Sequence, residues 1–415
     1  MTSPHLSNNP PPNTTRRIEV LVNGISSGHL VQEVGQIFYQ YHHHSTPIAN
    51  NPPVSLTMPV RIQSYLNVRL PPIFEMHLPE GYLEAVIKKQ FAKLVTVDDF
   101  GMLNLVANTV KGRVSFNSQK LIDEAHSKAT TAEPALTLNQ LIAPNNTHLF
   151  EELVGRFALQ SPLSGVQPKV LVGVENKATL KLDDYIVKAW GDDYPQLAIN
   201  EFFCMTAARL AGLNVPEFHL SNNDALFIIK RFDLGDNGDC YGFEDFCVLQ
   251  GKPRDLKYTG SYEQLAKSLK QFVSSHQRHP SLCQLFKLMV LNNALQNGDA
   301  HLKNFGILYA NINDIAMAPV YDIVSTTAYI THDVPALTFK GSKRWQTKPQ
   351  MIQFGIDHCA LSEKQALQHY QQCEEALRLT RTKIQLRLQQ EMGLIAPCAN
   401  KVRVMEHLMG LMISG

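Results

Sequence analysis

The sequence has no apolar run that approaches the roughly 18 residues of a membrane-spanning helix, so we expect no transmembrane segment. It also has no excess of charge of either sign, because 38 Lys and Arg residues face 37 Asp and Glu residues. The formal net charge of +1 argues against a general nucleic-acid coat and against a polybasic membrane-binding protein.

Cysteine pairs with the spacing of a metal or redox site are also missing. Seven cysteines occur, none in a C-x-x-C pair, at positions 204, 240, 247, 283, 359, 373 and 398. They are typical of ordinary thiols in a reducing compartment, and the N-terminus lacks the apolar core of a signal peptide, so we expect a cytoplasmic protein. Histidines 42–44 could bind a metal. Their sequence neighbours include no acid or cysteine, which favours a solvated loop.

Length and composition predict an α+β chain of several parts. The 415 residues, of which 44% are hydrophobic, are enough for two or three domains. Shifts in composition predict six segments: a disordered start (1–16), a first module (17–117), a linker or excursion (118–150), a small sheet-rich lobe (151–238), a larger helical lobe (239–395) and a C-terminal tail (396–415).

Local patterns predict several elements. IEVLVNG, from residue 18, alternates apolar and polar residues before Asn23-Gly24 and indicates a strand that enters a tight turn. VDDFGMLNLVANTVKGRVSF predicts a short helix and then a strand, and LAINEFFCMTAARLAGL predicts a helix that ends at Gly212. Ser362 and Gln365 have capping-box spacing at the start of a long helix.

The stretch NGDAHLKNFGIL (297–308) carries the most chemical information. Asp299 and Asn304 are five residues apart, the spacing at which a protein kinase places its catalytic aspartate and a magnesium ligand. His301 and Lys303 add donors that could meet phosphate or fix the loop. Asp322, in MAPVYDIVSTT, follows at the distance where a kinase presents its second metal carboxylate after a short hairpin. Solvated polar residues after a helix, and a turn aspartate, are the alternative interpretation of this stretch.

Lys188 lies inside the apolar strand DYIVKAW, where an unpaired lysine would be unfavourable. Glu201, thirteen residues on in the next helix, is the expected partner. A kinase holds its phosphate-binding lysine with a glutamate in this way. A lysine on the exposed face of an edge strand remains the alternative.

Two further stretches are candidates for nucleotide contacts. ALFIIKRFD (225–233) predicts a buried strand at a hinge between lobes, where the backbone at Lys230 and Phe232 could bind the adenine edge and Asp233 could bind the ribose. SPLSGVQPK (161–169) is a turn between strands with a single glycine, so it is a poor version of a glycine-rich phosphate loop, and Lys169 could contact phosphate.

These pieces, in this order, closely resemble the HipA-type serine/threonine kinases of bacterial toxin-antitoxin systems. The resemblance covers nearly the whole chain beyond residue 16 and rests on LPPIFEMHLPEG, SGVQPK, NEFFCMTAARLAG, FIIKRFD, NGDAHLKNFGIL and APVYDIVS. It implies a two-lobed protein-kinase-like α+β fold with an N-terminal α/β subdomain and a mostly helical C-lobe. It also implies ATP- and Mg²⁺-dependent phosphorylation, with Asp299 as catalytic base, Asn304 and Asp322 as magnesium ligands and Lys188 on the phosphates.

The family also implies regulation and partners. Its members tend to phosphorylate a serine in the loop that matches SPLSGVQPK, which here indicates Ser164, with Ser161 as the second candidate because Pro162 occupies the usual first position. They pair with a HipB-like DNA-binding antitoxin, and their targets cluster in translation, notably aminoacyl-tRNA synthetases. A small-molecule phosphotransferase and a kinase-fold binding protein without phosphotransfer are the competing hypotheses.

Overall fold

The structure is a computed structural model of the whole chain. It describes residues 15–42, 52–91, 98–118, 136–144, 148–157, 169–176, 181–235 and 240–412. The predicted disorder of residues 1–16 falls outside these ranges except at its end, where Arg16 begins the first strand. Ser161 and Ser164 also lie outside the described residues. None of the described helices has both the length and the apolar character that crossing a membrane requires.

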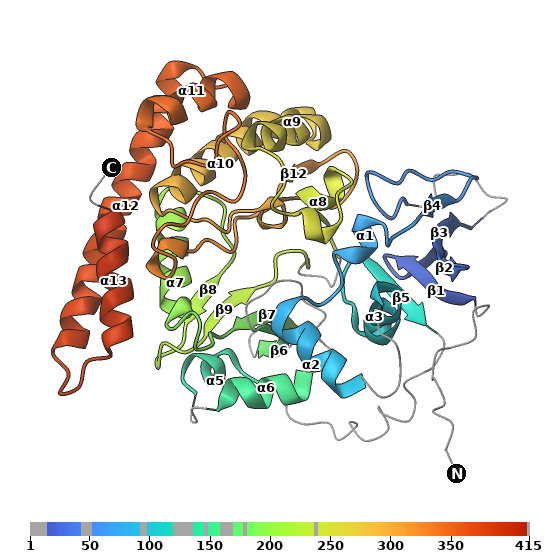
Figure 1. Ribbon diagram of the computed structural model, residues 1–415, viewed down its shortest axis with the longest axis horizontal. Helices are drawn as coiled ribbons and strands as arrows, with labels where there is room; N and C mark the ends of the chain where they lie inside the picture. The colour runs from blue at the N-terminus through green and yellow to red at the C-terminus, as the bar shows by residue number, and fades with distance from the viewer. Residues whose placement is uncertain are drawn as a thin grey trace, which may run out of the picture.

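The N-terminal module is built on an antiparallel sheet with strand order β4-β3-β2-β1-β5 (Figure 1). Its strands are β1 (Arg16–Val22), β2 (Ile25–Glu33), β3 (Gln36–Tyr41), β4 (Tyr65–Asn67) and β5 (Val114–Ser118). Asn23 and Gly24, with φ angles of 51° and 74°, form the tight turn between β1 and β2. The predicted strand and turn are therefore confirmed.

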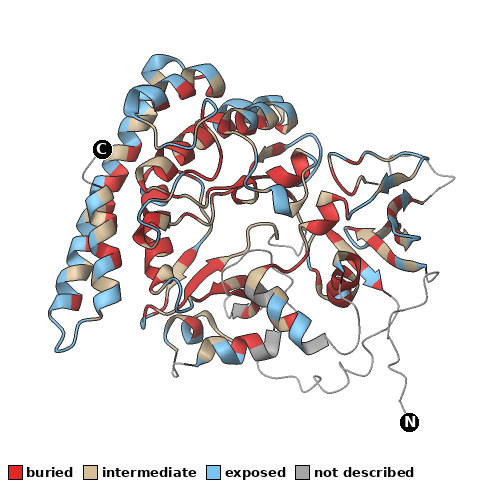
Figure 2. Ribbon diagram, in the orientation of Figure 1, coloured by how far each residue is buried: buried red, intermediate tan, exposed pale blue. Residues whose placement is uncertain are grey.

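Three helices complete this module: α1 (Pro72–Glu75), α2 (Gly81–Phe91) and α3 (Asp99–Val106). The carboxylate of Asp98 accepts a hydrogen bond from the Gly101 backbone N–H and caps α3. The predicted order of helix and then strand is confirmed by α3 and β5. Figure 2 shows that the sheet and helices bury their facing sides, and Ile18, Phe74 and Phe100 belong to one shared core.

A second antiparallel sheet has the order β6-β7-β9-β8 and forms the smaller kinase-like lobe. Its strands are β6 (Lys169–Asn176), β7 (Lys181–Lys188), β8 (Phe218–Leu220) and β9 (Phe227–Lys230). Because side chains alternate along a strand, β9 divides between two cores. Ile228 packs with the N-terminal module, whereas Phe227 and Ile229 pack with α7 (Leu197–Leu210) and the helical lobe.

Part of the predicted linker, residues 118–150, is folded. Helix α5 (Leu138–Ile142) begins at a capping box of Thr137 and Gln140, and α6 (Leu149–Phe157) follows. Both helices contact β6. Of the two interpretations, a folded excursion fits this part and a linker does not, because Leu138, Ile142 and their neighbours pack on the core that the two sheets share.

The C-lobe is mostly helical, as predicted. It contains α8 (Phe246–Leu249), α9 (Tyr262–Phe272), α10 (Ser275–Ala294), α11 (Lys348–Cys359), α12 (Glu363–Met392) and α13 (Ala399–Leu411), with a small sheet of β10 (Gly242–Asp245), β11 (Gly306–Tyr309) and β12 (Ile315–Met317). Ser362 and Gln365 form the expected capping box at the start of α12. All seven cysteines are free, in agreement with the expectation of ordinary thiols.

The predicted C-terminal tail is a packed helix. Helix α13 lies antiparallel to the second half of α12 and contacts both α12 and α7 (Figure 1). Its buried residues Val404, Met405 and Leu408 have helical spacing, so the tail interpretation of residues 396–415 is wrong for α13.

Candidate active site

A cavity of about 790 Å³ lies where the N-terminal module, the smaller sheet and the C-lobe meet. The N-terminal module contributes His77 and Glu80 to its wall, the sheet contributes Lys188, and the C-lobe contributes Asp299 and Asp322. This volume is in the range of pockets that bind small molecules, about 300–1,000 Å³. The two aspartates thus face one cavity, as the kinase interpretation requires.

The loop after α10 carries the first acid. Gln296, with φ of 51°, turns the chain out of the helix, and the Asn297 side chain accepts a hydrogen bond from the Asp299 backbone N–H at 3.1 Å. The Tyr258 hydroxyl donates to Asp299 Oδ1 at 2.5 Å. Burial in the cavity wall raises the pKa of Asp299 to about 6. The carboxylate is therefore ionised at neutral pH, and its pKa lies close enough to neutral pH for it to exchange a proton.

The second acid is tied to this loop through Asn304. The Asn304 Nδ2 donates to Asp322 Oδ2 at 2.7 Å, and the Asn304 Oδ1 accepts from the His301 backbone N–H at 3.0 Å. The hairpin of β11 and β12 separates the two residues in the chain, as predicted. Asp322 has φ of 61°, an unfavourable conformation for a residue with a Cβ, and such strain is concentrated at functional sites.

Lys188 joins this acid to the next helix. Its Nζ donates to Glu201 Oε1 at 2.5 Å and to Asp322 Oδ1 at 2.7 Å, and the Lys188 side chain is only 6% exposed. The predicted contact of Lys188 with Glu201 is present, and the exposed-strand alternative is wrong. The register explains the direction, because Lys188 pairs with Phe227, which faces α7.

The charges at this contact shift one another. Burial alone would raise the pKa of Asp322, but Lys188 and Lys169 hold it well below its usual range. Burial likewise opposes the charge on Lys188, yet Asp322 and Glu201 raise its pKa above the ordinary value. Glu201, which is completely buried, has its pKa raised by that burial in spite of Lys188. Asp322 is therefore ionised and lies beside the charged ammonium of Lys188.

Lys169 lies beside Lys188 and the other two candidate donors lie in the loop. Lys169 pairs with Lys188 in register, is buried and lines the cavity. The imidazole of His301 is neutral, because burial lowers its pKa to about 3, and it lies 3.9 Å from Asp299. The Lys303 ammonium is close to Glu80 at 3.2 Å and Asp245 at 3.6 Å. Lys303 thus joins the N-terminal module to the C-lobe, and it also lines the cavity.

Two of the three predicted hinge residues already make hydrogen bonds within the protein. The Lys230 backbone N–H donates to the Glu217 carbonyl at 2.8 Å, so it is not directed at a nucleotide. The Asp233 carboxylate accepts two hydrogen bonds from Arg231, at 2.9 and 2.6 Å, so a ribose would meet a carboxylate that is already paired. All three residues, Lys230, Phe232 and Asp233, line the cavity. The strand pattern predicted the position of this segment but not which of its groups the fold would use itself.

Comparisons with known proteins agree with this arrangement. The description "HipA-like C-terminal domain" matches residues 161–380, which is more than half of the chain, and "HipA N-terminal domain" matches residues 18–117. The chain belongs to the HipA family of kinases.

Curated relatives and a solved structure are also similar to this chain. Two Sinorhizobium fredii proteins named as kinases, Y4dM and Y4mE, are 28% and 27% identical to this HipA-like chain, over 67% and 76% of it and 68% and 79% of their own lengths. The Shewanella oneidensis HipA, solved with HipB and operator DNA, matches with a TM-score of 0.67 and 17% identity over 96% of both chains. This match shows that the fold is shared.

Two residues of the HipA-like site were missed by sequence reasoning. Tyr258 follows a 3₁₀ turn in a stretch with no motif, and only the fold brings its hydroxyl to Asp299. Glu80 lies between Lys257, at 3.0 Å, and Lys303. Burial opposes the charge on Glu80, but these two lysines lower its pKa to about 2. The LPEG segment that contains Glu80 gave no sign of a partner in the C-lobe.

Proposed function

We propose that this HipA-like chain is an ATP- and Mg²⁺-dependent serine/threonine protein kinase. The observation that carries the proposal is that Asp299 and Asp322 line one cavity together with the buried Lys188. Phosphoryl transfer needs a base near the acceptor, oxygen ligands for a metal and a cation on the phosphates, and these three residues supply one of each.

The geometry supports a role for each of these residues. Asp299 accepts the proton of the substrate hydroxyl, since its raised pKa of about 6 leaves it ionised at neutral pH. Asp322 and Asn304 would hold the magnesium, which prefers oxygen ligands, and magnesium bound with ATP would neutralise the charge of the phosphates. Lys188, oriented by Glu201, would place its ammonium on the phosphates.

The donor set fits this use. Lys188 donates a hydrogen bond to one oxygen of Asp322 and Asn304 donates to the other. These two donors stabilise the negative charge of the carboxylate. Ligation of a metal by Asn304 requires its side chain to turn, because its oxygen now accepts from His301. The aromatic rings of Phe232, Phe243 and Tyr321, with centroids 5.5 to 6.0 Å apart, line the same cavity and form a surface for a purine.

The test is transfer of labelled γ-phosphate from ATP in the presence and absence of magnesium. We expect Asp299→Asn and Asp322→Asn to reduce transfer by at least about 10²-fold to 10⁴-fold. Asp314→Asn is the matched control, because Asp314 is an exposed carboxylate paired with His276 on the β11–β12 hairpin loop. Transfer that survives both active-site changes would contradict the proposal. Transfer to a small molecule and not to protein would favour a phosphotransferase.

The toxin role is part of the same proposal. The HipA of the Shewanella complex is bound to HipB and operator DNA. We propose a HipB-like antitoxin for this chain, a target in translation such as an aminoacyl-tRNA synthetase, and autophosphorylation at Ser164 or Ser161. Phosphoproteomes of cells that express the intact chain or its Asp299→Asn variant should differ at a translation protein and at this loop. Growth arrest that persists in the variant would favour binding without phosphotransfer.

A further inference from the structure

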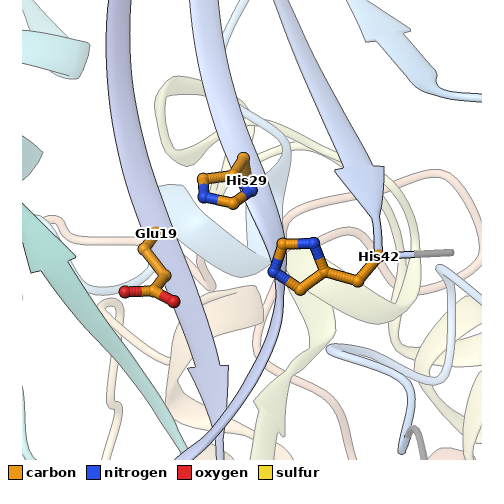
Figure 3. Close-up of side chains that lie close together, drawn as sticks. All are labelled: Glu19, His29 and His42. Atoms are coloured by element: carbon orange, nitrogen blue, oxygen red, sulfur yellow. The ribbon is translucent and has the colours of Figure 1, made fainter. Parts of the chain in front are cut away.

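Three potential metal ligands meet on the outer face of the N-terminal sheet, away from the kinase cavity. Glu19, His29 and His42 come from β1, β2 and the end of β3, and one ligand atom of each lies within 4.8 Å of the others (Figure 3). The sequence placed no acid near His42. The fold supplies one from another strand, so that part of the solvated-loop argument is wrong for His42, and His43 and His44 lie outside the described residues.

The strand register builds this cluster. Glu19 is directly opposite His29, and His29 is directly opposite Gln40, two residues before His42. Side chains of residues two apart share a face, so all three ligands lie on the same face of the sheet. The other face is apolar, because Ile18, Val20 and Leu30 belong to the core. The cluster therefore does not contribute to the hydrophobic packing of this module.

A β-bulge adds a fourth polar group. The pairing of β1 with β2 shifts between Val20 and Leu21, which brings Ser26 to the same face as His29 although the two are three residues apart. The Ser26 hydroxyl donates to Glu19 Oε1 at 2.5 Å and lies 2.9 Å from His42 Nε2. Asn117 on β5 donates to the other Glu19 oxygen at 3.1 Å. The carboxylate is thus oriented by two neighbours, as metal-binding carboxylates usually are.

We propose that Glu19, His29 and His42 bind a zinc ion that joins the first three strands of the N-terminal module. Two imidazoles and one carboxylate are a ligand set that suits zinc and leave a fourth position for water. Tetrahedral ligands at zinc distances of about 2.0–2.2 Å are roughly 3.3 Å apart, so small side-chain rotations would close the present cluster on an ion.

The local charges permit a cation. Burial lowers the pKa of His29, and the charges of Arg17 and His42 lower it further, whereas Glu19 raises it. The hydrogen bond from Ser26 is the largest influence on Glu19, whose pKa is lowered. Arg17 is the opposing charge, and its exposed side chain can be solvated. The alternative is a cluster held only by hydrogen bonds and by the edge-to-face contact of His29 with His42, whose centroids are 4.7 Å apart.

Zinc titration of the tag-free, chelator-treated full chain by isothermal calorimetry tests this site. We expect one zinc per chain, at least 10-fold weaker binding in His29→Gln, His42→Gln and Glu19→Gln, and a rise of the thermal unfolding midpoint with zinc only in the intact chain. Ser26→Ala, which changes a neighbour of two ligands, should weaken binding about 10-fold.

The matched control is His276→Gln, because His276 is an exposed histidine that pairs with one carboxylate, Asp314, at 2.9 Å. It should bind zinc like the intact chain, and His29→Gln should keep wild-type phosphotransfer and circular dichroism. The proposal would be overturned if the wild-type protein bound no zinc at saturating concentration. It would also be overturned if zinc binding survived the double change His29→Gln and Glu19→Gln. An equal loss in His276→Gln would also overturn it, since it would show non-specific surface binding.

Discussion

Replacement of Lys188 by Met should strongly destabilise the protein as well as inactivate it. The lysine is the cation between Glu201, whose side chain is 0% exposed, and Asp322, which is 28% exposed. Without it, Glu201 is a buried carboxylate with no hydrogen-bond partner among the described residues, because its Oε2 already has none. Removing one partner of a buried ion pair typically costs about 3–5 kcal/mol. We expect a loss of that size in the free energy of unfolding.

A double-mutant cycle separates this electrostatic role from a packing role. Lys188→Met combined with Glu201→Met replaces the pair by apolar side chains of similar length, a change that is often close to neutral in stability. Urea unfolding followed by circular dichroism gives the four free energies, with the slope of the transition checked for constancy. The double variant should recover most of the stability and remain inactive. Additive losses from the two changes would refute the reasoning, since contacting partners must couple.

Three further predictions use the shifted pKa values. Tyr258→Phe removes a hydrogen bond that lowers the pKa of Asp299, so the acid limb of the pH dependence of kcat/KM, expected near pH 6, should move to higher pH; an unmoved limb would show that Asp299 is not the titrating base. Glu80→Gln should reduce stability at pH 7 by about 2 kcal/mol and abolish the loss of stability that the wild type shows as the pH falls from about 4.5 toward 2, because a carboxylate with a depressed folded-state pKa stabilises only above that range. Burial lowers the pKa of His77 to about 4, so the wild type should lose stability as the pH falls from about 6.5 to 4, and His77→Phe should not. The free energy of unfolding, measured with urea at each pH, would contradict this if it changed with pH equally in both proteins.

Much of the fold was predictable because its signals are local. Asn23-Gly24 requires left-handed backbone conformations, and Ser362 with Gln365 satisfies the first N–H groups of a helix, so both patterns indicate structure without any knowledge of distant residues. The contact of Lys188 with Glu201 was also predictable, since a strand followed by its covering helix brings residues thirteen apart together.

The errors arise where the local signal was weak or was not used. The apolar positions Val404, Met405 and Leu408 have a helical period that indicates a packed helix. The prediction of a tail did not use this pattern. The pairing of the Asp233 carboxylate with Arg231, two residues before it, was not predicted. Both residues were visible in the sequence, but only the strand geometry shows that their side chains meet.

Other features depend on distant parts of the chain. Glu80 reaches Lys303 only because the N-terminal module packs on the C-lobe, and no local pattern encodes that contact. Likewise, Glu19, His29 and His42 share a face because of strand register, and Ser26 joins them through a bulge that a one-residue shift would remove. Register and module packing are global properties, and a single sequence read locally does not contain them.

The most direct test of the account is a crystal structure of the chain with a non-hydrolysable ATP analogue and Mn²⁺ in place of Mg²⁺. We expect an anomalous peak with oxygen ligands from Asp322 and Asn304, the terminal phosphate within hydrogen-bond distance of Lys188, and Asp299 facing that phosphate across the space for an acceptor hydroxyl. A nucleotide bound outside this cavity, or a manganese ion that contacts neither Asp322 nor Asn304, would contradict the account.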